Sequence, residues 1–477
     1  MKYVLVALLL IGCSSAGNEK RLKIDENGRY IEFTSGEPFL WIGDTAWDLF
    51  HDLNGEEATY YLENRAEKKF TVIQAVVLAE NDGLRKPNAY GEVPLIDLDP
   101  TKPNEAYLKH VDFIVNKAEE LGLYIGMLPT WGDKVFSENP GAGPVIFNKN
   151  NAAVYGEFLG KRYKDKPIIW ILGGDRNPAN DDVMEIWEAM ALGLKKGDGG
   201  IHLITYHPRG ASSSSTFFHN KDWLDVNMYQ SGHSKHFESV YRYAENDRTK
   251  TPAKPTIEGE PGYEDIAIEF WQFMDFSKPS EQRVSRGVLD EDYLIKDKSH
   301  FKKGFFTEDD VRVSAYWNLL SGAAGYTYGN NAVWQMFRKG GEVAIPALFD
   351  WKKSLDRPGA NDMRHVHELF TKRPFNKLVP DQTLILGDNP KGSTYILAAQ
   401  ANDQSFCIFY ASVGQLIPVD LSKMGDSIDA FWFDPRDGTV RAANFPENGS
   451  SFIPPTSGKG NDWVLILDNP SVNLPEL

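Results

Sequence analysis

Apolar and polar positions follow two alternating patterns through most of the chain. Short runs of consecutive apolar residues, typical of strands buried on both faces, are followed by longer segments with apolar residues three and four positions apart, as in helices that pack on a sheet. Segments of the helical kind lie at residues 56–68, 104–121 and 151–164. The runs that we expect to form strands are residues 39–43, 71–78, 124–129, 168–173, 203–207, 226–230, 255–260 and 313–317.

Eight strands alternating with helices predict an α/β fold, a closed (β/α)8 barrel of the TIM type. Short connections precede the third and fourth strands, so longer loops are expected at the opposite end, where the C-terminal ends of the strands converge. We assign residues 18–375 to this barrel. They include a small β element at 18–40 that caps the barrel floor, and a charged stretch at 277–305 that we interpret as a helical insertion after strand seven.

The pattern changes after a helix near residues 363–370. Short segments of alternating polarity then follow one another, separated by Gly, Asn and Asp turns, which is typical of antiparallel sheets. We therefore predict a C-terminal β-sandwich domain at residues 376–477 that packs firmly on the barrel. Its expected strands are residues 383–386, 395–399, 406–410, 428–434 and 463–468.

Residues 1–17 have the features of an export signal and anchor region. Lys2 precedes an apolar run, residues 4–11, that is too short to span a bilayer. The run ends in Leu10-Ile11-Gly12-Cys13, which resembles the lipobox of bacterial lipoproteins and would make Cys13 the lipidated residue; the alternative is a free thiol beside an ordinary cleavage site. We expect an exported outer-membrane lipoprotein, facing the periplasm or the cell surface and held only by its lipid.

Composition narrows the classes of partner. The net charge of −16 argues against nucleic acid and anionic membrane surfaces, which repel an acidic protein. The sequence has no His-Glu-x-x-His, Cys-x-x-Cys or P-loop motif, so we expect neither a metal nor another cofactor. Beyond Cys13 only Cys407 remains, which excludes a disulfide within the mature chain and indicates a small buried side chain. We expect a monomer.

Two acidic segments, each following an apolar strand, carry the candidate chemistry. Retaining glycoside hydrolysis needs a carboxylate nucleophile and a second carboxyl that donates and then accepts a proton, about 5–5.5 Å apart. Asp175 follows Gly173-Gly174 after the fourth strand, and we assign it as the acid/base; the alternative is a helix-capping Asp. Glu260 lies nearest the end of the seventh strand and is our nucleophile, with Glu258 the alternative because it has the same strand parity.

Further polar and aromatic residues follow the strands and could line a sugar-binding pocket, since sugars present hydroxyls at their rim and C–H bonds on their face. For any one of them a core or loop role is at least as good an explanation, but their arrival at one end of successive strands favours a site. The predicted substrate-binding residues are Asp44, Trp47, Gln74, Trp131, Arg176, Asn177, His207, Gln230, His233, Glu258, Trp317 and Tyr328.

The motifs Trp41-Ile42-Gly43-Asp44-Thr45-Ala46-Trp47, Gly173-Gly174-Asp175-Arg176-Asn177-Pro178, Tyr206-His207-Pro208, Gln230-Ser231-Gly232-His233 and Gly259-Glu260-Pro261-Gly262-Tyr263-Glu264 occur in this order. Together they resemble glycoside hydrolase family 140, the apiosidase-like group, and the C-terminal part is similar to the domain labelled "putative collagen-binding" that often accompanies it. The resemblance implies a retaining barrel enzyme that acts on plant pectin, at apiose-linked side chains of rhamnogalacturonan-II.

In this resemblance Asp175 matches the acid/base and Glu260 the nucleophile. An Asp after the fourth strand departs from the Asn-Glu pair of the broader hydrolase clan, and its side chain is one methylene shorter, so either the backbone approaches the substrate more closely or another residue is the acid. Two alternatives stay open: a glycosidase of another pectic, arabinose or galactose linkage, and a non-catalytic surface protein that binds polysaccharide or matrix.

Overall fold

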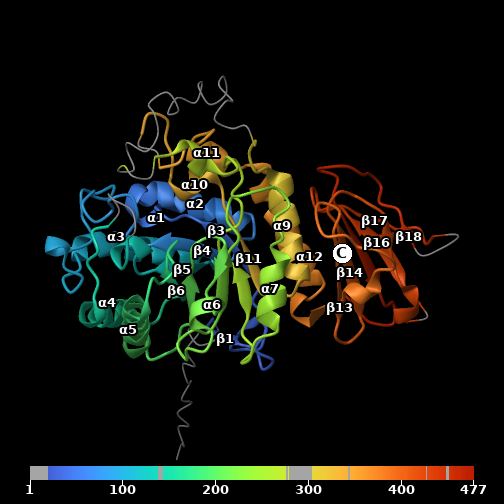
Figure 1. Ribbon diagram of the computed structural model, residues 1–477, viewed down its shortest axis with the longest axis horizontal. Coiled ribbons are helices and arrows are strands. Elements are labelled where there is room, and N and C mark those ends of the chain that lie inside the picture. The colour runs from blue at the N-terminus through green and yellow to red at the C-terminus, as the bar shows by residue number, and fades with distance from the viewer. Residues whose placement is uncertain are drawn as a thin grey trace, which may run out of the picture.

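The structure, a computed structural model, describes residues 20–137, 143–275, 278, 303–341, 344–425, 427–446 and 451–477. A barrel of strands and helices stands beside a smaller β domain, which forms the red end of the ribbon in Figure 1. Cys13 and the predicted signal lie outside the described residues, as does most of the predicted insertion at 277–305.

Parallel strands build the barrel, and each follows its sequence neighbour around the sheet. Strand β11 pairs with β3 on one side, while the Thr205 hydroxyl donates to the Val226 carbonyl at 2.8 Å and links β7 to the start of β9. A short strand, β8 (Ser212–Ser213), is antiparallel to β9. The eight parallel strands in the described part of the chain are β3 (Trp41–Thr45), β4 (Val72–Val76), β5 (Tyr124–Leu128), β6 (Ile168–Gly173), β7 (Ile204–His207), β9 (Asn227–Gln230), β10 (Thr256–Glu258) and β11 (Gly325–Tyr328).

The prediction for the eighth strand was wrong. Residues 313–317 belong to helix α9 (Glu308–Leu320), and the eighth barrel strand is β11, which follows the turn at Gly322. Helix α9 lies between the barrel and the C-terminal domain and is buried on nearly all sides. Its apolar residues therefore do not form a single stripe with a helical period. The mostly apolar residues at 313–317 have the pattern of a buried strand.

The outer helices begin where the sequence offers caps. Asn54 and Asn148 each accept a backbone N–H from the third helical residue, Glu57 and Asn151, whose side chains reach back to the cap. The three predicted helices are confirmed as α2, α3 and α4. The described helices besides α9 are α1 (Leu49–Asp52), α2 (Gly55–Glu67), α3 (Glu105–Glu120), α4 (Lys149–Tyr163), α5 (Asp181–Asp198), α6 (Ser215–Phe218), α7 (Tyr241–Arg248), α10 (Asn331–Trp334), α11 (Trp351–Ser354) and α12 (Pro358–Lys372).

A small hairpin closes the barrel floor, as predicted. Strands β1 (Leu22–Ile24) and β2 (Ile31–Phe33) pair antiparallel, and the Phe33 ring lies 5.5 Å from that of Phe39. Phe39 in turn contacts Tyr124, the first residue of β5, at 5.0 Å. The hairpin therefore covers the N-terminal ends of the strands, and the opposite face is left for the long loops.

The C-terminal domain is a six-stranded antiparallel sheet with a two-stranded ribbon, β15 (Ile417–Pro418) and β18 (Ser451–Phe452), packed on one side of it. Cys407 is a buried free thiol, as expected. The predicted strand at 383–386 is instead mostly a 3-10 turn, Gln382–Leu384. The sheet order is β12 (Leu378–Pro380), β13 (Ile396–Ala401), β14 (Phe406–Ala411), β19 (Trp463–Asp468), β16 (Asp429–Phe433) and β17 (Val440–Ala442).

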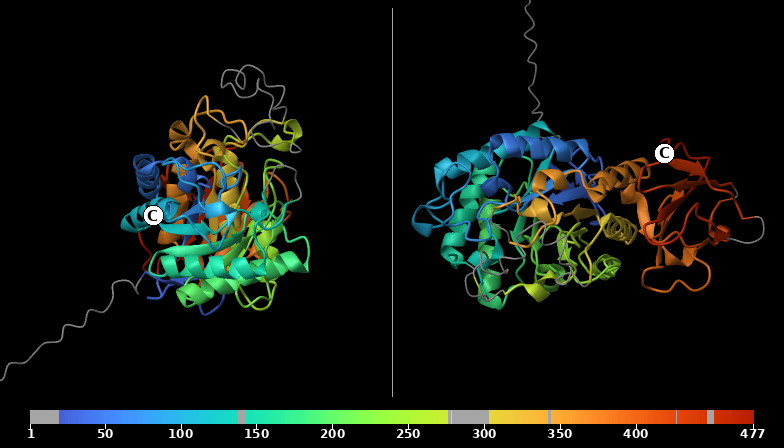
Figure 2. Two further views of the ribbon diagram at one scale, coloured as in Figure 1. Left: turned by 90° about the vertical axis from the view of Figure 1, so that its left-hand side faces the viewer. Right: turned by 90° about the horizontal axis from the view of Figure 1, so that it is seen from above.

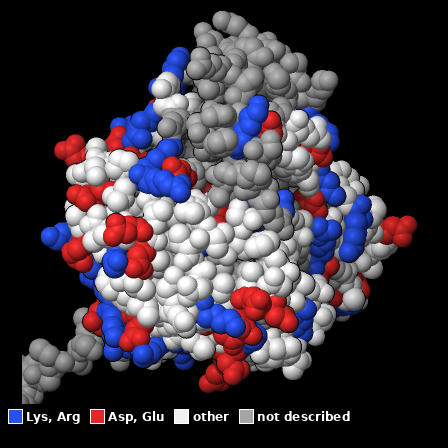
Figure 3. Space-filling view, turned by 60° about the vertical axis from the view of Figure 1, so that its left-hand side comes forward, with Lys and Arg blue, Asp and Glu red and all other residues white. Residues whose placement is uncertain are grey.

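The other side of this sheet packs on the barrel through α9 and α12, and one apolar core runs through both parts. The rings of Tyr316 on α9 and Tyr410 on β14 are stacked at 4.7 Å. Viewed from above in Figure 2, these two helices lie between the barrel and the sheet. The described residues contain no helix that is both long and apolar enough to cross a membrane. On the face shown in Figure 3, acidic and basic side chains are interspersed around a broad uncharged area.

Candidate active site

Glu260 lies at the centre of a polar cluster just beyond the C-terminal end of β10. Its carboxylate oxygens face two histidines: Nε2 of His207, the last residue of β7, lies 3.2 Å from Oε2, and Nε2 of His233 lies 3.1 Å from Oε1. Only 9% of the Glu260 side chain is exposed. The strand ends have thus brought together residues that are far apart in the sequence.

The backbone fixes the tautomer of both rings. Nδ1 of His207 accepts the backbone N–H of Asp175 at 3.3 Å, and Nδ1 of His233 accepts that of Tyr263 at 3.4 Å. A ring whose Nδ1 accepts carries an N–H on Nε2: that of His233 lies within hydrogen-bond distance of Glu260, and Nε2 of His207 lies close to Glu260 without a hydrogen bond of good geometry. Burial raises the pKa of Glu260, but the two imidazoles outweigh burial and set this pKa at about 2. The carboxylate is therefore ionised at any ordinary pH.

The carboxyl group of Asp175, just after the end of β6, has a raised pKa, in contrast to the lowered pKa of Glu260. Its side chain is 35% exposed, and Nη1 of Arg176 lies 3.2 Å from its Oδ2. Desolvation at the rim raises the pKa of Asp175, Arg176 opposes the rise, and the negative charge of Glu260 adds to it. Glu260 thus raises the pKa of Asp175, while the two histidines hold the pKa of Glu260 itself low.

The two glycines before Asp175 are required by their surroundings. Gly173 and Gly174 have φ of +87° and +104°, and a Cβ would lie 2.2 Å from the His207 carbonyl oxygen in the first case and 2.8 Å from the Trp131 ring in the second. His207 and Trp131 occupy the space beside these glycines, so the glycines let the turn pack on its neighbours.

Aromatic rings border the cluster. The Trp47 ring lies 5.3 Å from Trp131 and 5.4 Å from His207, and its Nε1 donates to the Tyr263 hydroxyl at 3.1 Å. Burial raises the pKa of Tyr263, and the nearby Glu260 carboxylate raises it further. Sequence reasoning did not single out Tyr263 as a site residue, although it stands three positions after Glu260 and was visible as part of the Gly262-Tyr263-Glu264 motif.

Three predicted amide residues lie around the same rim. Gln74 on β4 is buried and donates from Nε2 to the Gly259 carbonyl at 2.9 Å, which holds the chain just before Glu260. The Asn177 Oδ1 accepts the backbone N–H of Arg209 at 3.0 Å and joins the loops after β6 and β7. Gln230 is buried at the end of β9.

Glu258 is separated from this cluster. Its backbone is in register with Tyr229 on β9 and Tyr326 on β11, so the three side chains share one face of the sheet. The Tyr229 ring stacks on Tyr243 of α7 at 4.5 Å, which identifies this face as the helix side. The strand ends at Glu258, and the regular alternation that gave it and Glu260 the same parity stops there.

The model of the family described as "Apiosidase-like, catalytic domain" matches residues 25–377. The chain belongs to the apiosidase-like family. Residues 379–468 match the model described as "Putative collagen-binding domain of a collagenase". A search of curated protein sequences gave no match.

Several solved structures that are similar to this chain are described as glycoside hydrolases. One described as "Glycoside hydrolase" is 32% identical, with a TM-score of 0.81, over 95% of this chain and 98% of the other. A glycoside hydrolase family 5 protein from Bacteroides vulgatus ATCC 8482 is 31% identical, with a TM-score of 0.81, over 95% and 94%. A further glycoside hydrolase structure from that organism, 13% identical with a TM-score of 0.62 over 95% and 83%, shares the fold. The chain is a glycoside hydrolase with a carbohydrate substrate.

Three predicted site residues of this apiosidase-like domain lie elsewhere. Asp44 accepts from Nε of Arg65 at 2.6 Å behind the sheet, and Tyr328 lies under the same guanidinium, 5.9 Å from its ring centroid. The Tyr328 hydroxyl donates to Glu264 at 2.6 Å. Trp317, on α9 rather than on a strand, packs toward Tyr395 of the C-terminal domain. Each therefore packs the barrel against its outer elements and does not reach the cluster around Glu260.

No group of three or more His, Cys, Asp or Glu side chains in the described ranges of this apiosidase-like chain is arranged to hold a metal ion. The two histidines that face Glu260 use both ring nitrogens in the contacts given above. The described site is built from carboxylates, imidazoles and aromatic rings.

Proposed function

We propose that this glycoside hydrolase works with retention of configuration, with Glu260 as nucleophile and Asp175 as acid/base. The observation that carries the proposal is the place of the two carboxyl groups at one end of the barrel: Glu260 lies between two imidazoles, which hold its pKa low, and Asp175 lies at the rim, where its pKa is raised. A nucleophile must be ionised and an acid must hold its proton, and these two environments support the proposed roles.

In the first step Asp175 gives its proton to the glycosidic oxygen while a Glu260 oxygen attacks the anomeric carbon. The bond to the leaving sugar breaks and an ester between Glu260 and the glycosyl group forms. Asp175, now anionic, takes a proton from water, whose oxygen attacks the same carbon and releases Glu260 as a carboxylate. His207 and His233 hold Glu260 in place as its charge is lost and regained.

Glu260→Gln and Asp175→Asn each keep the shape of the side chain and test these roles. Each is expected to lower turnover by roughly 10³-fold or more, because each group takes part in bond making. Azide should restore turnover in Glu260→Ala by occupying the place of the carboxylate, with a glycosyl azide as product. Wild-type turnover in Glu260→Gln would refute the nucleophile assignment.

For the substrate we propose pectic glycans of plant cell walls, with apiose-linked side chains of rhamnogalacturonan-II as the first candidate. The family match supports this choice, since its model is described as apiosidase-like. Incubation with a panel of pectic oligosaccharides, with free apiose scored directly, tests it. Release of arabinose or galactose without apiose would replace the substrate while leaving the catalytic proposal in place.

We further propose that the protein is an exported lipoprotein of the outer membrane. Lys2, the short apolar run and Cys13 support this. The intact mass of the protein from its native membrane should show cleavage before Cys13 and added acyl chains, and Cys13→Ala should release the protein from the membrane. For residues 376–477 we propose a role in covering α9 and α12, with which they share one apolar core.

A further inference from the structure

Buried polar atoms gather on the helix side of β9, β10 and β11, directly behind Glu260. Oε2 of Glu258, Oγ of Ser231, Oγ of Ser314 and the hydroxyl of Tyr326 are shielded from solvent; among the described residues Ser231 lies near Glu258 and Ser314 near Tyr326, but none of the four atoms makes a hydrogen bond of good geometry. Such groups are costly to leave unsatisfied, so native proteins pair them or give them an internal water. Two of these residues, Ser231 and Ser314, line the same small cavity.

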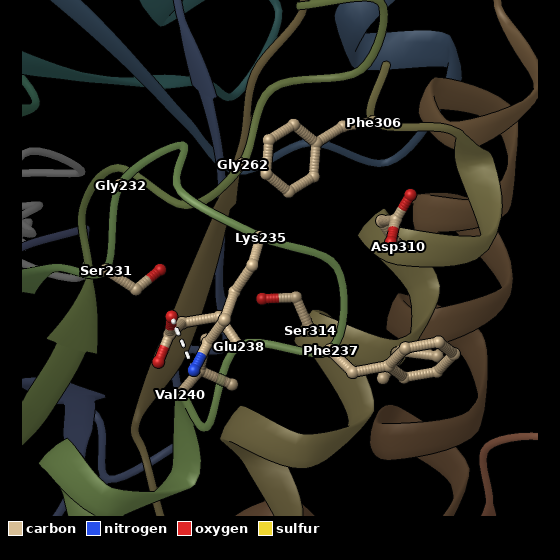
Figure 4. A pocket seen from close by; sticks show the side chains of 11 residues that line it. Ser231, Gly232, Lys235, Phe237, Glu238, Val240, Gly262, Phe306, Asp310 and Ser314 are labelled. Atoms are coloured by element: carbon tan, nitrogen blue, oxygen red, sulfur yellow. Dashed lines mark ion pairs between the residues drawn. The ribbon is translucent and has the colours of Figure 1, made fainter. Parts of the chain in front are cut away.

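This cavity lies between the loop after β9 and helix α9. Its volume is about 20 Å³, enough for one water molecule. Figure 4 shows the hydroxyls of Ser231 and Ser314 directed toward one another across it. Lys235 and Glu238, which also line it, form an ion pair at 3.6 Å and so satisfy each other. The cavity therefore has room for one water, with the hydroxyls of Ser231 and Ser314 as polar partners among largely apolar walls.

The same loop is tied to the strand end that carries Glu260. The backbone N–H of Ser231 donates to Oε1 of Glu258 at 3.0 Å, and the next N–H, that of Gly232, donates to the Glu260 carbonyl at 3.2 Å. His233 then contacts the Glu260 carboxylate and accepts the N–H of Tyr263. Successive residues of the loop thus meet successive parts of the segment from 258 to 263.

We propose that Glu258 anchors the loop through the Ser231 N–H, that one water in this cavity bridges the Ser231 and Ser314 hydroxyls, and that this network positions His233 against Glu260. Glu258 is the first anchor of the loop, and a loop that moves at Ser231 moves the imidazole two residues later. The inference rests on the proposed nucleophilic role of Glu260. It makes Glu258 a positioning residue on the far side of the sheet and removes it as an alternative nucleophile.

The first test compares Glu258→Gln with Glu258→Leu in the full-length protein. The amide oxygen of Gln can still accept the Ser231 N–H, so kcat should stay within roughly threefold of wild type. Leu removes the acceptor and leaves that N–H buried, and a displacement of His233 should lower kcat by roughly 10- to 100-fold with a smaller change in KM. The acid limb of the kcat profile should also move to higher pH in Glu258→Leu, measured only at pH values at which circular dichroism shows the variant to be folded, so that acid unfolding does not account for the shift.

Glu264→Gln is the matched control. Glu264 is an equally buried glutamate whose Oε1 accepts the Gly359 N–H at 3.1 Å, but it lies in the packing between the barrel and α12. In Glu264→Gln, the acid limb of the kcat profile should lie at the same pH as in wild type. Ser314→Val, which fills the cavity from the α9 side, should move the acid limb in the same direction as Glu258→Leu and serves if that variant does not fold.

A crystal structure of the wild-type protein tests the water independently of activity. A water within hydrogen-bonding distance of Ser231 and Ser314 is expected, and a dry cavity would overturn the network. Loss of all turnover in Glu258→Gln, or unchanged kcat and acid limb in both Glu258→Leu and Ser314→Val, would overturn the positioning role. Full activity of Glu260→Gln would instead refute the proposed function while the water remains in the crystal.

Discussion

At the scale of single residues, the reactivity proposed here depends on two imidazoles that keep Glu260 ionised. His233→Phe preserves an aromatic ring against Tyr263, which lies 4.6 Å away, but removes the Nε2–H that faces Glu260. Because this donor favours the charged form, the pKa of Glu260 should rise and the acid limb of kcat/KM should move to higher pH. At its optimum the variant should lose roughly 10- to 100-fold in kcat/KM.

The control for His233→Phe is His236→Phe, on the same loop. Nδ1 of His236 lies 2.7 Å from Asp310 and does not face Glu260. The acid limb of this variant should coincide with that of wild type. If His233→Phe also gave the wild-type acid limb, the histidines would not be what holds the pKa of Glu260 low.

Glu258 should also affect how the free energy of unfolding depends on pH. Burial raises its pKa from 4.5 to about 8, with Tyr229, Tyr243, Tyr326 and Glu260 as the titratable groups around it. The folded state therefore binds a proton that the unfolded state releases between these pH values. Its contribution is fully present below pH 4.5 and is lost as pH rises toward 8. Denaturant unfolding at several pH values should show a shallower loss of stability in Glu258→Gln than in wild type.

At the scale of elements, the turn from β6 to α5 shows how backbone geometry sets the site. Gly174→Ala adds a Cβ at positive φ and 2.8 Å from the Trp131 ring, whereas Gly122→Ala adds one at φ +77° with open space around it. Both variants should lose about 1–2 kcal/mol of stability from the left-handed backbone. Only Gly174→Ala should also lose activity, by roughly 100-fold, since Asp175 follows it. Equal kcat/KM in the two variants would show that the turn tolerates the shift.

The alternation of strand and helix patterns was enough to predict the barrel, because parallel strands and their outer helices carry different periods. Helix α9 was not predicted as a helix, because a helix that is packed on both sides has no polar stripe. Strand β11 is only Gly325–Tyr328, two of its four residues being tyrosines and one a glycine, and gives a weak strand signal. The misplacement of Trp317 followed directly from that error.

The site was predictable to the extent that strand ends converge. His207, His233, Trp47 and Trp131 all meet near Glu260 for this reason. Sequence parity could not separate Glu258 from Glu260, because the strand stops between them and the chain turns. Which face Asp44 and Tyr328 take depends on Arg65, a partner on α2 that no strand pattern reveals.

At the scale of the whole molecule, the barrel and the C-terminal domain share a buried ionic network. Arg312 on α9 donates to Asp462 of the C-terminal domain at 2.9 Å and to Asp362 on α12 at 2.8 Å, and the Tyr410 hydroxyl donates to the same Asp462 at 2.8 Å. Arg312 is only 3% exposed. Because one cation serves carboxylates from both parts, we expect the two to unfold together.

Arg312→Leu tests this expectation. Removal of the guanidinium leaves Asp462 and Asp362 buried beside each other without a cation, which should cost about 3–5 kcal/mol of unfolding free energy. Replacing Asp462 with Leu as well removes one of the two buried carboxylates that have no cation beside them. The double variant should therefore regain part of the lost unfolding free energy. Calorimetry should show a single transition in wild type, and its midpoint should fall most in Arg312→Leu. Two separate transitions in wild type, with only one of them moved by Arg312→Leu, would show instead that each part is stable by itself and that the network only orients them.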